Sequence, residues 1–399
     1  MAKIAFVDLV FNYPPNGGAS TDLYGIMSGL KDDHDIRLFL PAHKKINISQ
    51  DFDFHYELIE TSFFGFNYKS YPDKLKKELT RYEPDFLFVA DGWYLKPYII
   101  NNLSEFNPIL RFYAYETLCL KSHGHFARLN KLCKKNYLQD PWASTFECKI
   151  CSFLWILSNH NRVFLQEFLN AKVYLPGYAR IVKDALKNAW KIIVYNNFTK
   201  SIVAKYNEDV IVIPSGVDIE KFRPFNKSGK NEKIKILAFG RYEHWFKGIK
   251  LLIETCKKLW EKRQDFILCI TTDKEYNEPF IQKLGWIKHS ELPAIINDSD
   301  ICVIPSIWEE PFGISVVEAM SCGKAVLGSD AGGIPEIIEH ERSGLIFKRD
   351  LNGDLAEKLE RLMDDEKLRT NLGKSARKRI EENFSWDRVI NKYYRSFIK

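Results

Sequence analysis

The chain has no long hydrophobic run and no dense block of charge of one sign. No apolar stretch approaches the ~20 residues that a transmembrane helix needs, so no membrane span is expected. The opening residues, MAKIAFVDLVF, lack the apolar core and the small-residue cleavage site of a signal peptide, and we therefore predict a cytoplasmic protein. The net charge is only +6, and no Lys/Arg-rich run of the kind that binds nucleic acid is present.

Cysteine is scarce too, with eight residues in 399. In a cytoplasmic chain we expect these to be thiols and not a disulfide framework. Four of them, Cys119, Cys133, Cys148 and Cys151, occupy one segment, but only the last two are close together, as CKIC. That spacing is not the paired arrangement of a zinc ribbon, so plain thiols and a structural zinc site both stay open.

One stretch does carry a local excess of positive charge. Between Arg111 and Lys135, six basic residues stand against a single acidic one, Glu116. Such an excess suits contact with anionic lipid or with an anionic substrate, although a solvated face is an equally good interpretation. A peripheral contact with the inner face of the membrane is therefore one expectation for this protein.

The length predicts two domains, because a single core rarely serves 399 residues. Short apolar runs alternate with longer amphipathic ones, which is typical of α/β folds with parallel sheets. The polar stretch Arg223–Ile236 indicates a linker, so we expect one Rossmann-like domain over residues 1–223 and a second over residues 224–384. The expected strands are Lys3–Leu9, Ile36–Leu40, Phe86–Ala90, Ile109–Ala114, Ile192–Tyr195, Val210–Ile213, Ile234–Phe239, Phe266–Thr271, Ile301–Pro305 and Ala325–Gly328.

Open parallel sheets bind ligands beyond the carboxyl ends of their strands, where the strand order reverses. Two such domains that face each other would enclose a cleft. The loops that we expect to line it are Asn12–Ser20, Arg241–Gly248, Gly285–Glu291 and the stretch that follows ICVIPS.

That last stretch, WEEPFGISVVE, combines two carboxylates with a glycine and the start of a helix. Glu310 precedes Pro311, which biases it towards an extended conformation outside the helix. The helix is expected to begin near Gly313, where unpaired amides and the positive end of the helix dipole favour a diphosphate. Glu318 follows about one turn later. A nucleotide sugar has the matching shape, with hydroxyls at each end and a diphosphate between them.

The segment EPFGISVVE resembles the E-x7-E motif of the family 4 glycosyltransferases, which are retaining enzymes of GT-B fold. Other segments of the second half are similar to patterns of that family in the same order, namely IPSGVDIEKFRP, FGRYEHWFKG, HSELPAIINDSDICVIPS and GSDAGGIPEII. The first half matches more loosely, in PPNGGAS and KIIVYNNFTKSIVAKY. The resemblance implies an α/β protein with two Rossmann-like parallel-sheet domains facing across a cleft, and a final helix, Ser385–Lys399, that packs back on the first domain.

The resemblance also implies a role for individual residues. Arg241 and Lys247 would bind the donor diphosphate and neutralise its charge as the leaving group departs. Glu310 would hold sugar hydroxyls, and Glu318 would bind the ribose. The other donor-binding residues that it implies are Phe312, Gly313, Ile314 and Ser315 through their amides, the backbone near Ile287 for the base, and Gly17 and Gly18 for the approach of the first domain to the phosphates.

The first domain departs from the family pattern at one position. The family often has a His at the end of a strand, where it reaches the sugar, and RFYAYETLC puts Tyr115 there. A Tyr can donate a hydrogen bond to a sugar hydroxyl but cannot carry charge as His can. We place Tyr115 in the predicted catalytic set with Arg241, Lys247 and Glu310. His123 and His125 lie close by in sequence and are alternatives for a role that needs an imidazole.

These features predict a retaining glycosyltransferase of the hexosyltransferase type, acting in polysaccharide, glycolipid or glycoconjugate synthesis. Its partners would be a nucleotide sugar and a carbohydrate or lipid-linked acceptor. No nucleophile is assigned, because the resemblance implies same-face attack in which the leaving phosphate helps to deprotonate the acceptor. No cofactor and no essential metal are expected, since Arg241 and Lys247 take the role of a metal.

Other functions on the same kind of sheets have different requirements. A nicotinamide-dependent oxidoreductase needs Gly-x-Gly-x-x-Gly after its first strand, and VDLVFNYPPNGGAS lacks that pattern. A non-catalytic nucleotide-sugar-binding protein and a nucleotide-sugar epimerase both stay open. Tight donor binding without turnover would indicate the former, and conversion of the free nucleotide sugar without an acceptor would indicate the latter.

Overall fold

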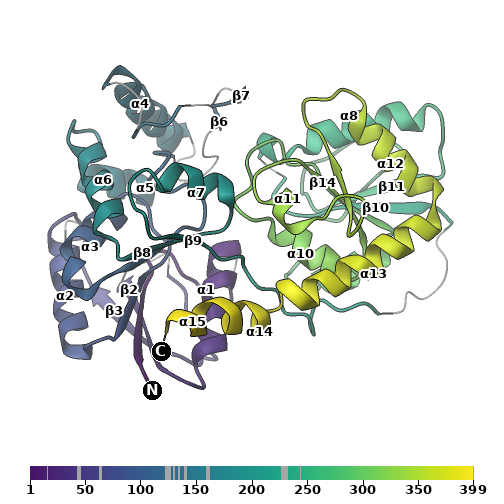
Figure 1. The fold of residues 1–399 in the computed structure, drawn as a ribbon. Coiled ribbons are helices and arrows are strands. Elements are labelled where there is room, and N and C mark those ends of the chain that lie inside the picture. The colour runs from purple at the N-terminus through teal and green to yellow at the C-terminus, as the bar shows by residue number, and fades with distance from the viewer. Residues whose placement is uncertain are drawn as a thin grey trace. The chain divides into compact units, whose positions relative to one another are not determined.

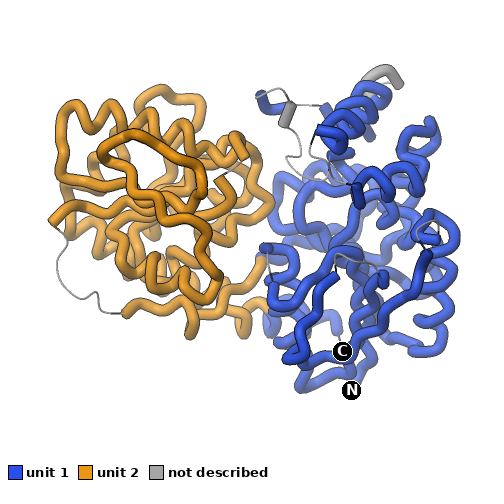
Figure 2. Tube along the Cα trace, turned by 180° about the vertical axis from the view of Figure 1, so that it is seen from behind, with its two compact units in different colours: residues 1–214, 390–399 blue, residues 215–389 orange. Residues whose placement is uncertain are grey.

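The fold is described from a computed structural model of the chain. The structure describes residues 1–15, 17–42, 46–62, 65–121, 127–128, 131–133, 135–138, 142–158, 162–225, 232–242 and 244–398. The chain divides into two compact units (Figure 2). Unit 1 comprises Met1–Pro214 and Ile390–Lys399, and unit 2 comprises Ser215–Val389.

Unit 1 is built on a seven-stranded sheet with the order β3-β2-β1-β4-β5-β8-β9, in which every pairing is parallel. Its strands are β1 (Lys3–Val7), β2 (Asp35–Ala42), β3 (His55–Glu60), β4 (Phe86–Val89), β5 (Ile109–Arg111), β8 (Lys191–Val194) and β9 (Val210–Val212). The interior strands are nearly all apolar because both of their faces are covered, as in β1, where Ile4 to Val7 are buried.

Helices cover both faces of this sheet (Figure 1). The helices of unit 1 are α1 (Gly18–Leu30), α2 (Ser70–Tyr82), α3 (Lys96–Asn102), α4 (Trp142–Ser158), α5 (Arg162–Asn170), α6 (Tyr178–Asn188) and α7 (Asn197–Val203). Unit 1 also has a short 3-10 turn η1 (Ser104–Phe106) and a small antiparallel pair, β6 (Ala127–Arg128) and β7 (Lys131–Leu132). The helix α2 shows why they pack. It buries Tyr71, Leu75, Leu79 and Tyr82 along one stripe at helical spacing.

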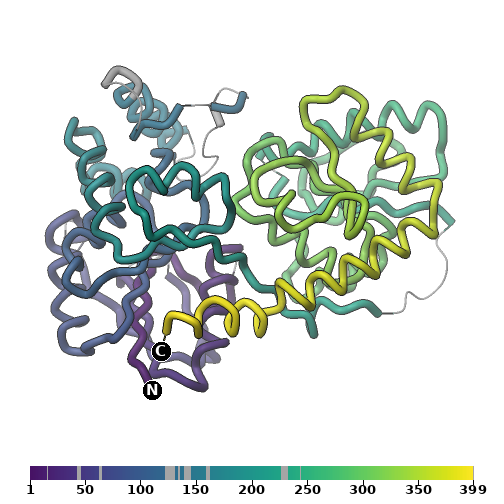
Figure 3. Tube along the Cα trace, in the orientation of Figure 1, coloured from purple at the N-terminus to yellow at the C-terminus, as the bar shows by residue number. Residues whose placement is uncertain are grey.

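The last ten residues complete unit 1. Among them, Ile390–Tyr394 form the π-helical segment η3 and Arg395–Phe397 form the short helix α15. A Cβ at Gly29 of α1 would lie 2.4 Å from Ile390, so glycine is what allows this close packing. The ring of Tyr394 lies 6.2 Å from that of Phe88 in β4. Figure 3 shows this yellow segment beside the purple start of the chain.

Unit 2 has a six-stranded sheet with the order β12-β11-β10-β13-β14-β15, again with every pairing parallel. Its strands are β10 (Ile234–Ala238), β11 (Phe266–Ile270), β12 (Ile281–Lys283), β13 (Ile301–Ile304), β14 (Ala325–Ser329) and β15 (Leu345–Phe347). Its helices are α8 (Ile249–Trp260), α9 (Leu292–Asp298), α10 (Ile314–Ser321), α11 (Ile334–Ile337), α12 (Asp354–Asp364), α13 (Glu366–Asn383) and α14 (Trp386–Val389), with a 3-10 turn η2 (Trp245–Lys247).

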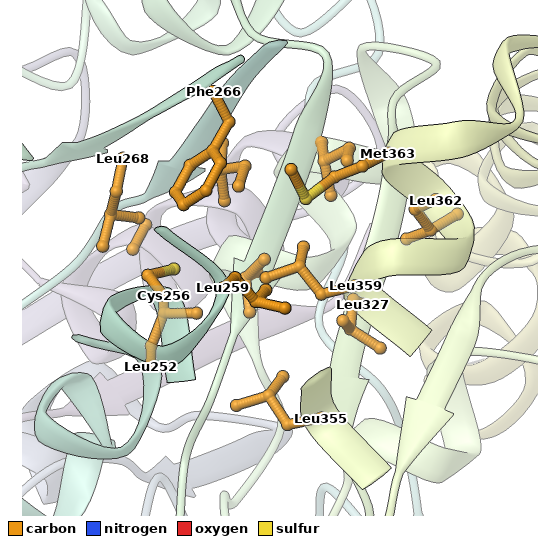
Figure 4. Close-up of a cluster of buried hydrophobic side chains, with 14 of the residues drawn as sticks. Leu252, Cys256, Leu259, Phe266, Leu268, Leu327, Leu355, Leu359, Leu362 and Met363 are labelled. Carbon is orange, nitrogen blue, oxygen red and sulfur yellow. The ribbon is translucent and has the colours of Figure 1, made fainter. Parts of the chain in front are cut away.

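One hydrophobic cluster of unit 2 lies between its sheet and the helices α8 and α12. Leu252, Cys256 and Leu259 of α8 meet Leu355, Leu359, Leu362 and Met363 of α12 over Phe266, Leu268 and Leu327 of the strands (Figure 4). The helix α8 places its buried residues at intervals of three and four, which is the stripe that this packing requires.

The predicted fold class is confirmed, since both units are parallel-sheet α/β structures. Each predicted strand overlaps an observed one, whereas β3, β6, β7, β12 and β15 were not predicted. The predicted linker Arg223–Ile236 lies inside unit 2, and its residues 226–231 fall outside the described residues. His123 and His125 also fall outside them.

Candidate active site

The loops after β10 and β13 start where the strand order of the second sheet reverses. From β10 the chain proceeds outward through β11 to β12, and from β13 it proceeds to the opposite edge through β14 to β15. Open parallel sheets bind ligands at such switch points, beyond the carboxyl ends of the strands. The loop after β10 holds Arg241 and Lys247, and the loop after β13 holds Glu310. The fold therefore brings all three to one end of this sheet.

Backbone contacts tie these two loops together. The amides of Ile307 and Trp308 donate to the carbonyl of Phe246, at 3.0 and 3.3 Å. Gly248 has a φ of +75°, and a Cβ at this position would lie 1.8 Å from the carbonyl oxygen of Pro305. Only glycine permits both this backbone conformation and this approach. The turn η2, which ends at Lys247, is thereby fixed against the second loop.

The Glu310 carboxylate lies at the meeting point of the two loops. Its side chain is 8% exposed, and its Oε1 accepts hydrogen bonds from Nζ of Lys247 at 2.6 Å, from Nε1 of Trp308 at 3.1 Å and from the hydroxyl of Ser306. The Lys247 ammonium also lies 5.2 Å from the centre of the Trp308 ring. Burying a carboxylate is costly unless donors such as these satisfy its oxygens. Ser306 and Trp308 were not predicted, although both lie within four residues of Glu310.

Arg349, which follows β15, holds the same stretch from another side. Its guanidinium donates to the carbonyl of Ile307 at 2.8 Å, to Glu309 Oε1 at 3.1 Å and to Asp330 Oδ1 at 2.8 Å. The second oxygen of Glu309 accepts from the amide of Gly332 at 2.6 Å. Arg349 therefore positions the backbone that carries Glu310. No motif in the sequence signalled it.

The helix α10 begins directly after this stretch, as predicted. Gly313 forms its N-terminal cap with a φ of +116°, and its carbonyl accepts from the amide of Val316 at 2.9 Å. The predicted amides of Ile314 and Ser315 lie in the first turn, where an α-helix leaves its N–H groups without partners inside the helix. A Cβ at Gly240 would lie 3.8 Å from the Ser315 hydroxyl, so the loop that carries Arg241 runs beside this helix start. The Phe312 ring is buried, 6.1 Å from that of Phe384.

Glu318 lies one turn further along α10 and contacts a residue that was not predicted. Its Oε1 is 2.6 Å from Nε2 of His289, and Nδ1 of the same ring is 2.8 Å from Nζ of Lys221. Burial lowers the pKa of Lys221, against the opposing effect of the negative charges of Glu318 and Asp218. His289 and Lys221 both lie in segments that resemble the family, so their positions were available in the sequence, but no spacing connected them to Glu318.

Ile287 lies two residues before His289, in the loop between β12 and α9. It is half-buried, while the side chain of its neighbour Trp286 is 67% exposed. Gly285 enters this loop with a φ of +70°. The loop that was predicted to meet the base therefore leads directly into the His289 contact.

The other predicted site residues belong to unit 1. Gly17 is extended and caps the start of α1, and Gly18 is the first residue of that helix. Tyr115 is fully buried, and its ring lies 5.9 Å from that of Phe198 in an edge-to-face arrangement. The predicted roles of Gly17, Gly18 and Tyr115 stay predictions.

The four clustered cysteines share one small pocket in unit 1. Cys119, Cys133, Cys148 and Cys151 all line it, and its volume is about 30 Å³. Within the described ranges, however, no group of three or more His, Cys, Asp or Glu side chains is arranged to hold a metal ion. The described residues therefore provide no set of ligands for the zinc site that the sequence left open.

The helix α4, next to this pocket, exposes a continuous apolar face. Its large exposed side chains are Phe146 (57%), Ile150 (42%), Phe153 (37%), Leu154 (58%) and Leu157 (45%). Their spacing follows the helical period, so they lie along one stripe. Among the helices of the described residues, none has both the length and the apolar character that a bilayer crossing requires.

A family model matches the second half of the chain. Residues 218–379 match the family model described as glycosyl transferases group 1. An uncharacterized glycosyltransferase of Methanocaldococcus jannaschii is 30% identical over 286 residues, which cover 66% of this chain and 70% of that protein. A Campylobacter jejuni N,N'-diacetylbacillosaminyl-diphospho-undecaprenol alpha-1,3-N-acetylgalactosaminyltransferase is 30% identical over 240 residues, which cover 54% of this chain and 63% of the relative. A second M. jannaschii glycosyltransferase is matched over 59% of its length.

Solved structures resemble the whole chain. Sucrose-phosphate synthase from Thermosynechococcus elongatus superposes with a TM-score of 0.67 at 17% identity, with 99% of each chain covered. Anabaena HepE in complex with UDP and glucose superposes with a TM-score of 0.66 at 16% identity, again with 99% of each chain covered. At these identities the likeness establishes the fold, which is GT-B. The family is shown by the M. jannaschii relative that is 30% identical and matched over 70% of its length, in agreement with the family model. This chain belongs to the family 4, or group 1, glycosyltransferases.

Proposed function

We propose that this protein is a retaining glycosyltransferase that moves a sugar from a nucleoside diphosphate donor to an acceptor hydroxyl. One observation carries the proposal. At the switch point of the second sheet, the structure gathers a buried carboxylate, Glu310, its cation Lys247 and the start of α10. A second buried carboxylate, Glu318, lies one turn further along the same helix. This order of groups matches the order of hydroxyls, diphosphate and ribose in a nucleotide sugar.

The start of α10 would hold the diphosphate. Its first-turn amides, at Ile314 and Ser315, and the positive end of the helix dipole favour a group of negative charge. Gly313 lacks a Cβ and lets the phosphates approach the backbone. Phe312 keeps this turn in place by its burial.

Arg241 and Lys247 would stabilise the charge that develops on the departing diphosphate. An ammonium has three donors, so Lys247 can keep its 2.6 Å contact with Glu310 while it also donates to a phosphate oxygen. Glu310 would accept hydrogen bonds from hydroxyls of the sugar. We propose no metal ion for this step, because the two side chains supply the positive charge.

The transfer itself needs no protein nucleophile in this proposal. The acceptor oxygen forms a bond to the anomeric carbon on the face that the diphosphate leaves, and the bond from that carbon to the phosphate oxygen breaks. The proton of the acceptor hydroxyl passes to the leaving phosphate oxygen. Retention of configuration follows, and catalysis rests on positioning and charge stabilisation.

We also propose a carbohydrate or lipid-linked acceptor and a cytoplasmic protein that contacts the inner face of the membrane. The exposed apolar stripe of α4, which includes Phe146 and Leu154, supports this contact. A helix face of this kind binds the boundary between headgroups and acyl chains. Flotation with anionic vesicles tests it, since Phe146→Ser with Leu154→Ser should abolish co-flotation. Unchanged co-flotation would remove α4 from the contact.

A thermal-shift panel of UDP, GDP and ADP sugars tests the donor site. A ligand that binds only the folded protein raises the melting temperature by mass action. One donor should produce a shift, and Glu318→Ala should abolish it. No shift with any nucleotide sugar would refute the proposal, and an unchanged shift in Glu318→Ala would refute the ribose role.

Turnover tests the catalytic residues. Arg241→Ala combined with Lys247→Ala should lower transfer by about 100-fold or more, because charge stabilisation of the leaving group is lost. The exposed pair Lys250→Ala with Lys258→Ala provides a control with the same loss of charge. Near-normal activity of the first double variant would remove both residues from the site.

The same assays distinguish the two alternative functions. Donor binding without transfer to any acceptor would indicate a binding protein, and conversion of the donor without an acceptor would indicate an epimerase.

A further inference from the structure

The contact between Glu318, His289 and Lys221 joins three segments that are distant in sequence. Glu318 lies in α10, His289 in the loop before α9, and Lys221 in the turn that follows Asp218. The Glu318 side chain is 5% exposed, while that of His289 is 39% exposed. The histidine therefore stands between solvent and a buried carboxylate that is proposed to bind ribose.

We propose that His289 is a positioning residue, which Lys221 supports and which fixes the Glu318 carboxylate in the orientation that receives the ribose hydroxyls of the donor. The inference rests on the proposed function and deepens it. His289 and Lys221 both lie outside the E-x7-E segment, and together they would orient Glu318, the second carboxylate of that segment.

The two contacts of the imidazole ring determine which nitrogen carries the proton. Nε2 lies 2.6 Å from a carboxylate oxygen, which can only accept, so Nε2 donates. Nδ1 lies 2.8 Å from the Lys221 ammonium, which can only donate, so Nδ1 accepts. The neutral ring satisfies both partners, whereas a doubly protonated ring would turn an N–H towards the ammonium. The ring therefore connects a cation to an anion in one defined orientation.

The main chain around Lys221 is fixed to the helix that carries Glu318. Asp218 Oδ1 accepts from the amide of Lys221 at 2.9 Å and closes the turn. The carbonyl of Phe222 accepts from the hydroxyl of Ser321, three residues after Glu318, and from Nη1 of Arg377 at 2.9 Å. Lys221 is thus held relative to α10 by bonds that do not involve its own side chain.

The Phe222 ring restricts the imidazole from one side. Its centre lies 5.3 Å from that of the His289 ring, at an interplanar angle of 52°. Phe222 confines the imidazole ring, and both of its nitrogens have hydrogen-bond partners. The hydrogen bond from Nε2 therefore holds Oε1 of Glu318 in one orientation. Its Oε2, for which the described residues supply no hydrogen bond, is left for a ligand hydroxyl. A carboxylate oriented before binding loses less conformational entropy when the ligand arrives.

The test measures nucleotide affinity by calorimetry on the full chain. The probes are the nucleoside diphosphate, among UDP, GDP and ADP, that binds the wild type best, and its dideoxy analogue, which lacks both ribose hydroxyls. His289→Leu should weaken the ribonucleotide about tenfold, as loss of a charge-assisted contact implies, and should change the affinity for the dideoxy analogue by less than about twofold. His289→Gln, whose amide can still donate to Glu318, should recover most of the loss. The exposed His55→Leu, in unit 1, is the control.

The outcomes separate the inference from the function on which it rests. If the wild type binds none of the three nucleotides, the proposed function fails. If the wild type binds but His289→Leu weakens both probes equally, or neither, the positioning role is wrong while the function stands. Should His289→Leu fail to fold, Lys221→Met removes the support on the other side of the ring. It should lower ribonucleotide affinity selectively, and equal loss for both probes would overturn the inference.

Discussion

The ion pair between Lys247 and Glu310 makes a quantitative prediction for the stability of unit 2. The two atoms lie 2.6 Å apart, and the side chains are 25% and 8% exposed. With an effective dielectric constant of about 20, the attraction is roughly 6 kcal/mol before any cost of desolvation. Removing both groups from water offsets most of this, and hydrogen bonds to charged groups have net values of about 1.5–3 kcal/mol. We therefore expect a coupling free energy of about 2 kcal/mol.

The perturbation is a double-mutant cycle with Lys247→Met and Glu310→Gln. Lys247→Met alone should lower the free energy of unfolding by about 2–3 kcal/mol, because a buried carboxylate loses its cation while Ser306 and Trp308 continue to donate to it. The double variant should be more stable than the sum of the two single effects implies, by about 2 kcal/mol.

Urea unfolding of the full chain measures these values, provided that tryptophan fluorescence and circular dichroism report the same transition. Lys76 and Glu105 form a matched control, since their atoms are also 2.6 Å apart but their side chains are 37% and 55% exposed. Their coupling should be about 0.5 kcal/mol or less. If the Lys247–Glu310 cycle gives no more than this control, burial does not strengthen the pair and the argument for an organised carboxylate is wrong.

Two further predictions concern a buried carboxyl and a glycine. Burial raises the pKa of Glu167 from 4.5 to about 7, so its stabilising contribution is complete below pH 4.5 and is lost as the pH rises through 7. Across that interval Glu167→Gln should remove up to about 3 kcal/mol of pH dependence from the free energy of unfolding, and an unchanged slope would contradict this sign. Gly248→Ala should destabilise by about 3 kcal/mol or more, because its Cβ would overlap a carbonyl. Gly353→Ala, at a φ of +91° with open space around it, should cost about 1 kcal/mol in thermal unfolding. Equal losses would show that the close approach to Pro305 is not what requires glycine.

The interior strands could be predicted from the sequence because a strand that is buried on both faces is a continuous apolar run. β1 and β13 are continuous apolar runs, and no other element of their length needs such a run. The strands of the two large sheets that were missed, β3, β12 and β15, all lie at sheet edges. β3, HYELIE, exposes most of its residues, and β12 contributes only IQK. An edge strand is set by its pairing partner more than by its own composition.

The candidate site likewise contains some features that local sequence predicts and others that depend on contacts between distant residues. Glu310, Gly313 and the start of α10 could be predicted because local sequence determines a pre-proline residue, a cap and a helix start. His289 could not, since its partners lie 29 residues away at Glu318 and 68 away at Lys221, and no periodicity connects such positions. A lone histidine in a loop gives no sign of its neighbours until the chain has folded.

Because Ile390–Lys399 belong to unit 1, the two units become complete in a fixed order during synthesis. A ribosome releases the first 214 residues of unit 1 long before the final ten, and all of unit 2 is synthesised between them. Until then Gly29 of α1 lacks its contact with Ile390, and Phe88 lacks its contact with Tyr394. Domains generally fold as units while the chain emerges. Here all of unit 2 is synthesised before unit 1 receives Ile390–Lys399, so unit 2 can fold while unit 1 is still incomplete.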